Sequence, residues 1–185
     1  MGDTRAIDPL INLLKDENDR ILRQIVESLG KIGDPRVIEP LLGCLKDESS
    51  KVQSEALSAL GKIGDPQTID AISSYLKDSD VNIRRAAGWA LAGISDDRCV
   101  DLIISLLEDE HWYVRSGAAE ALKTMDDPKA SAALLDLEEK HLAQLTEGLL
   151  EVFKDPELAE QVYYGNHDNP YLIAAVQDVV RKNLK

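Results

Sequence analysis

The chain has 185 residues, of which 44% are hydrophobic, so it is long enough and apolar enough to bury a core. Its 34 acidic residues outweigh 21 basic ones, and the net charge of −13 argues against binding to nucleic acid or to an anionic membrane. There is no apolar run of membrane-spanning length and no signal-peptide pattern, so we expect a cytoplasmic protein. Cys44 and Cys99 have no metal-ligand neighbours and are expected to be free thiols.

A repeat of 31 residues runs through the first two thirds of the chain. The hexapeptide GKIGDP occurs at residues 30–35 and again at residues 61–66. Apolar columns keep the same step, and one of them consists of Leu29, Leu60, Leu91 and Leu122. The sequence therefore predicts four regular repeats in residues 1–127.

Each repeat contains two predicted helices. In the second repeat, residues 37–45 and 52–63 both carry apolar residues three and four positions apart, which is typical of amphipathic helices. The Gly-Asp-Pro tripeptide at 64–66 supplies a helix-ending glycine, a capping aspartate and a first-turn proline. Pro9 and Pro40 lie inside predicted first helices, so we expect these helices to be bent or to begin late.

The repeat becomes irregular in residues 128–185. Residues 143–154 are predicted to form a fifth second helix, either as a separate helix or within one long helix hinged near His141, because no turn residues interrupt the chain there. Two more helices are predicted at 155–164 and 170–182. We expect divergent repeats and a C-terminal cap of the same array. The predicted fold is an all-α, right-handed superhelical solenoid (an α-α superhelix) of about six helical hairpins.

The fourth repeat, DEHWYVRSGAAEALKTMDDP at residues 109–128, combines an acidic turn with Val-Arg, Ala-Ala and Ala-Leu pairs. This pattern resembles the HEAT-like repeats first associated with phycobilisome lyases. The resemblance implies that the second helices line a concave face. It also implies a ladder between repeats, in which Arg84 and Arg115 join the turn aspartates Asp78 and Asp109.

The variable positions of the second helices are the candidate partner-binding surface, since the resemblance places these helices on the concave face. This surface is charged towards its N-terminal end and aromatic towards its C-terminal end, and Trp, Tyr and Arg dominate binding hot spots. Gly93 and Gly117 are expected to leave room for a partner to reach the aromatic rings. Whether the two tryptophans are exposed or packed stays open. The candidate partner-binding residues are Arg20, Arg23, Lys51, Glu55, Arg85, Trp89, Trp112, Tyr113, Ser116 and Glu120.

No pattern of catalytic, cofactor-binding or metal-ligating residues is found. The three histidines lie in different repeats, and His111 occupies a column of helix-capping residues. We therefore expect a non-catalytic scaffold that binds a protein or a peptide and needs no cofactor or metal. The resemblance leaves one alternative, a lyase-type or chaperone subunit that grips a tetrapyrrole or similar planar ligand with Trp89, Trp112 and Tyr113. Apolar residues of the first hairpin also leave a homo-oligomer open.

Overall fold

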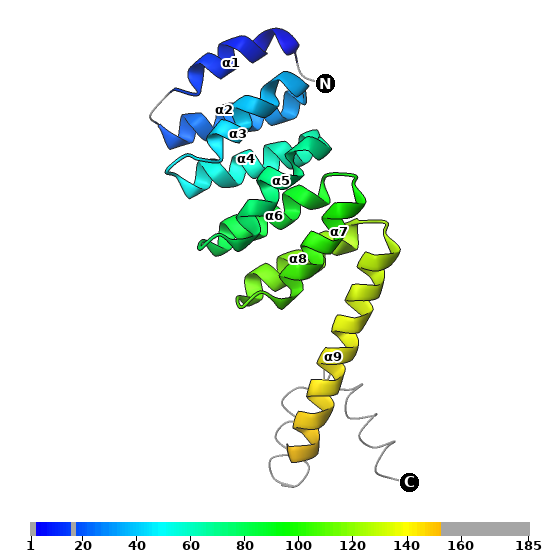
Figure 1. The fold of residues 1–185 in the computed structure, drawn as a ribbon. Coiled ribbons are helices and arrows are strands. Elements are labelled where there is room, and N and C mark those ends of the chain that lie inside the picture. Colours follow the sequence, from blue (N-terminus) through cyan, green and yellow to red (C-terminus); the bar gives the residue numbers. More distant parts are fainter. Residues whose placement is uncertain (1–2, 16–17, 153–185) are drawn as a thin grey trace. The chain divides into compact units, whose positions relative to one another are not determined.

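The computed structural model describes residues 3–15 and 18–152, and its described side chains end at residue 141. All secondary structure in these ranges is helical, as predicted. The first helices of the four repeats are α1 (Ile7–Leu13), α3 (Ile38–Cys44), α5 (Ile69–Ser73) and α7 (Asp97–Ser105). The second helices are α2 (Asp19–Ile32), α4 (Ser50–Ile63), α6 (Val81–Ala92) and α8 (Trp112–Thr124), which begin in steps of 31 residues (Figure 1).

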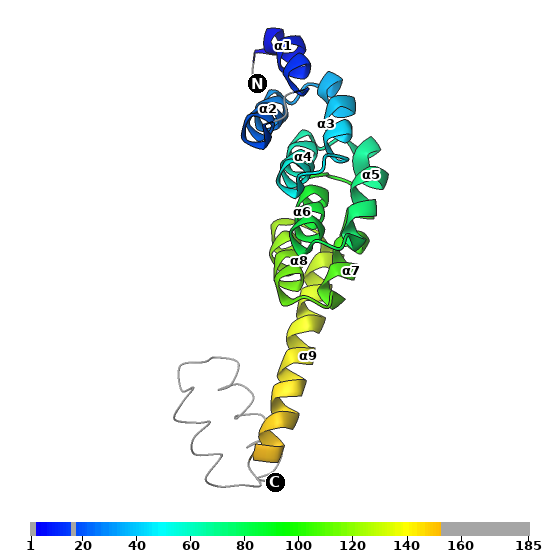
Figure 2. The same cartoon turned by 90° about the vertical axis from the view of Figure 1, so that its left-hand side faces the viewer.

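The second helices stack on one another and form one layer of the repeat array. Helix α2 packs on α4, α4 on α6, and α6 on α8. The first helices form the other layer, which Figure 2 shows beside the first. Residues of the leucine column in the second helices are all buried between the layers: Leu29, Leu60, Leu91 and Leu122. The array is thus an all-α solenoid built from helical hairpins.

The GKIGDP motif sets both the spacing and the turns of the array. A Cβ atom on Gly61 would lie 2.6 Å from Cα of Ala90, so only glycine lets α4 approach α6 this closely. Gly64 ends α4 in the left-handed conformation, with φ 71°. Asp65 then accepts a hydrogen bond from the backbone amide of Gln67 and caps the next turn.

The first helices begin late, as Pro9 and Pro40 predict. Each of α1 and α3 is preceded by a turn of 3-10 helix, at Thr4–Ala6 and Pro35–Val37. Both prolines are the third residue of their α-helix. They therefore fall in the first turn, where an amide has no acceptor within the α-helix and its loss costs least.

The last described helix, α9 (Pro128–Val152), is one helix of 25 residues, in agreement with the long-helix alternative. The chain divides into two compact parts, Met1–Ser131 and Ala132–Lys185. The helices predicted at 155–164 and 170–182 lie outside the described residues. The continuation of the solenoid through residues 128–185, its six hairpins and its handedness therefore stay predictions. No helix in the described ranges is both long and apolar enough to cross a membrane.

Candidate partner-binding surface

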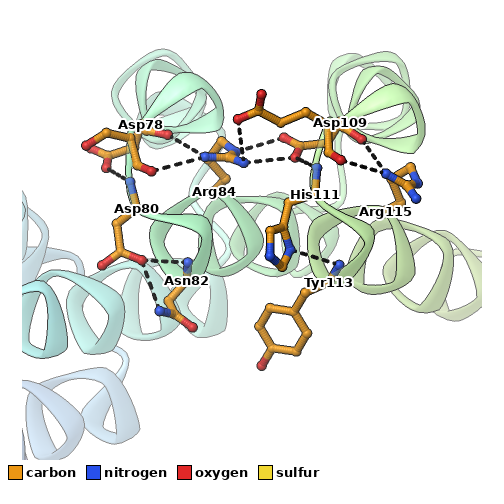
Figure 3. A network of polar contacts seen from close by, with 10 residues as sticks. Asp78, Asp80, Asn82, Arg84, Asp109, His111, Tyr113 and Arg115 are labelled. Atoms are coloured by element: carbon orange, nitrogen blue, oxygen red, sulfur yellow. Dashed lines mark hydrogen bonds and ion pairs between the residues drawn. The ribbon is translucent and has the colours of Figure 1, made fainter.

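The turns that lead into the second helices hold the ladder implied by the arginine column (Figure 3). The Nε and Nη2 atoms of Arg84 donate to the carboxylate of Asp109 in the next repeat, at 2.8 and 2.9 Å. Its Nη1 atom donates to the backbone carbonyl of Asp78. Arg115 makes the corresponding bond to the carbonyl of Asp109, at 2.8 Å. The ladder therefore joins the third repeat to the fourth through the ion pair of Arg84 with Asp109 and a longer ion pair with Glu110, at 3.8 Å. Asp78 takes part through its backbone rather than its carboxylate.

The ion pair between Arg84 and Asp109 is buried. Side chains of Arg84 and Asp109 are 7% and 9% exposed. The hydrogen bond from Arg84 lowers the pKa of the Asp109 carboxyl, and the same bond raises the pKa of the guanidinium. The turn geometry at the joint between the two repeats is thereby fixed.

The same turns position the start of each second helix. The Nδ1 atom of His111 accepts a hydrogen bond from the backbone amide of Tyr113 at 3.2 Å, so His111 caps α8 as its column predicts. Asp80 caps α6 in the same way, through the amide of Asn82. Trp112, the first residue of α8, follows its capping histidine directly and is held at the edge of the helix layer.

The two tryptophans are exposed on what we call the second-helix face, the surface formed by the outward residues of α2, α4, α6 and α8. Trp112 is 64% exposed and Trp89 is 37% exposed. The ring of Trp112 stacks on that of His111, with centroids 6.1 Å apart, and meets the ring of Tyr113 edge-on at 5.7 Å. The structure therefore answers the question that the sequence left open, because neither tryptophan is part of the core.

Arg85 is hydrogen-bonded to two residues of α8 and packs against a third. Its guanidinium lies 4.4 Å from the centroid of the Tyr113 ring and donates to the Tyr113 hydroxyl and to the carboxylate of Glu120, both at 3.0 Å. A Cβ atom on Gly117 would lie 2.5 Å from Nε of Arg85. The expectation that Gly117 leaves room for a partner is therefore wrong, since the Arg85 side chain occupies that room.

Gly93, the other glycine expected to leave room, is also occupied. A Cβ atom there would lie 2.5 Å from the carbonyl oxygen of Gly61. The glycine serves the close approach of neighbouring repeats. The expected access for a partner at this position is therefore wrong, because backbone atoms of α4 occupy the space.

The charged end of the face contains a hollow between α2 and α4. The hollow has a volume of about 450 Å³, and its lining residues are Arg23, Ser50, Lys51, Ser54, Glu55 and Asn82. Three of these are predicted binding residues. The three others are small or polar: Ser50 and Ser54 belong to α4, and Asn82 reaches the hollow from the first turn of α6. Arg20 is exposed in the first turn of α2, and Ser116 is half-buried on α8.

The predicted residues thus form two clusters rather than one site. One cluster lies on α2 and α4, and the other on α6 and α8. In the described part of the chain, no group of three or more His, Cys, Asp or Glu residues could hold a metal ion. The first cluster offers charged side chains, and the second offers the exposed aromatic rings of Trp89 and Trp112.

Comparison with known proteins agrees with this architecture. A family model described as HEAT repeats matches residues 1–52, 38–98 and 69–152. Among solved structures, the complex of CpcE and CpcF of phycocyanin lyase from Nostoc sp. PCC7120 is similar, with a TM-score of 0.61 and 19% identity over 76% of this chain and 91% of that chain. Human deoxyhypusine hydroxylase in complex with glycerol has a TM-score of 0.49 and 21% identity over 98% of this chain and 80% of that one. At such identities the likeness is one of fold. No match was found among curated proteins.

Proposed function

Because the chain belongs to the HEAT-repeat family, we propose that it is a non-catalytic scaffold that binds a protein or a peptide on its second-helix face. Stacked helical hairpins present an extended surface whose variable residues do not contribute to the core. The similar solved structure is itself a complex of two proteins, CpcE and CpcF, which supports a protein partner for this chain.

Exposed Trp112 is the observation that carries this proposal. The residues Val114, Ala118, Ala121 and Leu122 of the same helix are buried, whereas Trp112 exposes 64% of its surface. Tryptophan loses little conformational entropy on binding and offers a large contact area, so it is a frequent anchor of interfaces. Arg85 holds Tyr113 in place and so orders the neighbourhood of the anchor before any partner arrives.

A matched pair of variants tests the proposal. Trp112→Ala removes the anchor, and Leu135→Ala removes a large apolar side chain of similar exposure, 61%, from α9. Affinity capture from a lysate of the source cells should recover a protein with the wild type and with Leu135→Ala, and lose it with Trp112→Ala. An anchor of this kind is worth about 2 kcal/mol or more, which is about thirtyfold in affinity. Equal recovery by both variants would remove Trp112 from the interface.

The second candidate function is binding of a tetrapyrrole or a similar planar ligand. It is favoured by the stacked rings of His111 and Trp112 and by the fold shared with a phycocyanin lyase complex. Adding a bilin should then change the bilin absorbance, and Trp112→Ala should abolish the change. An unchanged spectrum with the wild type rejects this candidate.

Self-association is supported by one further contrast in burial. Ile21 is 41% exposed, whereas Val52, Ile83 and Val114, which occupy the same column, are at most 1% exposed. In the later repeats this column is covered, so the first hairpin presents an apolar surface suited to another hairpin. Light scattering over a range of concentrations tests a dimer through this surface, and Ile21→Asp should reduce it to the monomer mass.

A further inference from the structure

Equivalent grooves lie between neighbouring second helices along the second-helix face. One of them, between α6 and α8, is filled by a side chain, whereas its equivalent two repeats earlier is not. Arg23 and Arg85 occupy the same column, two repeats apart. Arg85 is hydrogen-bonded to Tyr113 and Glu120 and lies against Gly117, so its guanidinium is already paired within the fold. The groove between α6 and α8 is therefore filled by the protein's own arginine.

The corresponding groove between α2 and α4 remains open. Glu55 replaces the glycine of the later repeat, and the Nη2 atom of Arg23 and the Oε2 atom of Glu55 are 3.9 Å apart, beyond hydrogen-bond distance. The Arg23 side chain is 48% exposed. Lys51, which replaces the tyrosine, is exposed and forms no ion pair with any described residue. Ser54 and Asn82 add neutral polar groups to the lining of the same hollow.

The charges of this hollow select an anionic group. It holds two cations and one carboxylate, on a chain whose net charge is −13. A carboxylate from a partner would replace the loose contact of Glu55 with Arg23 and would meet Lys51, which has no ion-pair partner there. A lysine or arginine from a partner would meet two like charges instead.

Trp112, the exposed apolar residue of the second-helix face, lies two repeats further along than the hollow. Lys51 is the second residue of α4 and Trp112 is the first residue of α8, so both lie at the N-terminal edge of the helix layer. Packed helices are about 8–10 Å apart, which separates these two edge positions by about 16–20 Å. An extended peptide advances about 3.3 Å per residue and covers this span in about five or six residues.

We infer that the partner segment is an extended acidic peptide, with Asp or Glu bound by Arg23 and Lys51 and an apolar side chain five or six residues away bound by Trp112. This inference rests on the proposed function and specifies its partner. The direction in which the peptide runs along the face depends on whether its acidic residue or its apolar residue comes first in its sequence.

Fluorescence anisotropy with synthetic peptides tests the inference on the full chain. Each labelled peptide is about ten residues long, on a Gly-Ser background, and carries two Glu residues and one Leu separated by five residues, in either order. Control peptides replace Glu by Gln or Lys, or shorten the separation to one residue. The acidic peptide with the long separation should bind about tenfold more tightly than the Lys peptide, and added salt should weaken it.

Three protein variants give predictions of different sign. Lys51→Gln should weaken the acidic peptide about tenfold, because it removes a binding cation. Glu55→Gln should strengthen binding, because it removes the competing carboxylate. Lys62→Gln, an exposed lysine at the far end of α4, is the matched control and should leave binding unchanged.

Equal or tighter binding of the Lys peptide overturns the inference, as does the absence of binding by every peptide or of any response to Lys51→Gln. Failure of the proposed function is a separate outcome, because it is measured by capture from the lysate. If capture depends on Trp112 while acidic peptides show no preference, the inference alone fails. If the wild type captures no protein, the proposed function fails; if it captures one without dependence on Trp112, the anchor is wrong and the inference fails with it.

Discussion

Loss of the Arg84 guanidinium should weaken the joint between the third and fourth repeats. Arg84 is buried, with 6% of its surface exposed, and its side chain is paired with the similarly buried side chain of Asp109. The substitution Arg84→Met keeps most of the aliphatic volume. It removes the two hydrogen bonds to Asp109 and the bond to the carbonyl of Asp78.

The expected cost follows from what is left behind. Asp109 would keep a hydrogen bond from the backbone amide of His111 at 2.9 Å, but its buried carboxylate would lose its counterion. Removing one partner of a buried ion pair costs about 3–5 kcal/mol. The remaining hydrogen bond favours the lower end, so we expect a loss of about 3 kcal/mol in the free energy of unfolding.

Two other arginines provide graded controls. Arg115 donates to the carbonyls of Asp109 and Glu110, so Arg115→Met should cost about 1 kcal/mol. Arg20 is exposed, and Arg20→Met should cost less than about 0.5 kcal/mol. Urea unfolding followed by tryptophan fluorescence is the appropriate assay, because the only two tryptophans lie on α6 and α8, the helices that the joint connects.

The result that would refute this reasoning is a cost for Arg84→Met no larger than that of Arg20→Met. The pH dependence is a second check. Because Arg84 lowers the pKa of Asp109 in the folded state, the stabilisation is complete above the unfolded pKa of about 3.9 and is lost as the pH falls through the folded value. The difference between wild type and Arg84→Met should therefore be constant from neutral pH to about pH 5 and should shrink below about pH 4.

Packing and burial at glycine, isoleucine and cysteine positions allow three further tests. Gly61→Ala should cost about 1–3 kcal/mol in urea unfolding, because its Cβ would lie 2.6 Å from the backbone of α6, whereas Gly43→Ala meets nothing within 4 Å and should be neutral or stabilising. Ile83→Ala should cost about 3 kcal/mol and Ile21→Ala about 1 kcal/mol by the same assay, since the first is fully buried and the second is exposed; equal costs would contradict the burial difference. Burial raises the pKa of Cys44 to about 11, so alkylation by iodoacetamide should be slow at pH 7 and accelerate towards pH 11, and rapid labelling at pH 7 would contradict a protonated thiol.

Most of the fold was predictable because the punctuation of each repeat acts locally. Gly33 adopts φ 69° at the end of α2, and Asp34 caps the following turn through the amide of Arg36. Both roles depend on neighbouring residues alone. The role of Gly30 was not predictable in this way, because the atom that its Cβ would meet, Cβ of Ala59, belongs to the next repeat and comes close only after the helices stack.

The sequence predicts which positions of the second helices face outwards, but it does not predict which residues their side chains contact. The repeat period identifies which side chains point away from the core, and both tryptophans are indeed exposed. The position of the Arg85 side chain depends on how α6 meets α8, and it reverses the expectation for Gly117. Spacing along the sequence does not determine whether a long side chain fills a groove or leaves it open.

Arg84 and Arg85 show how neighbouring residues of one helix serve two different parts of the molecule. They are adjacent in α6, and successive residues of a helix point about 100° apart. Arg84 is therefore directed to the turn of the next repeat and stabilises the joint, whereas Arg85 crosses the second-helix face to Tyr113 and Glu120. In the first repeat the same two columns hold buried Leu22 and half-exposed Arg23. A buried leucine there takes the place of the ion-paired arginine, while the neighbouring column on the second-helix face keeps its arginine, so the two columns vary independently.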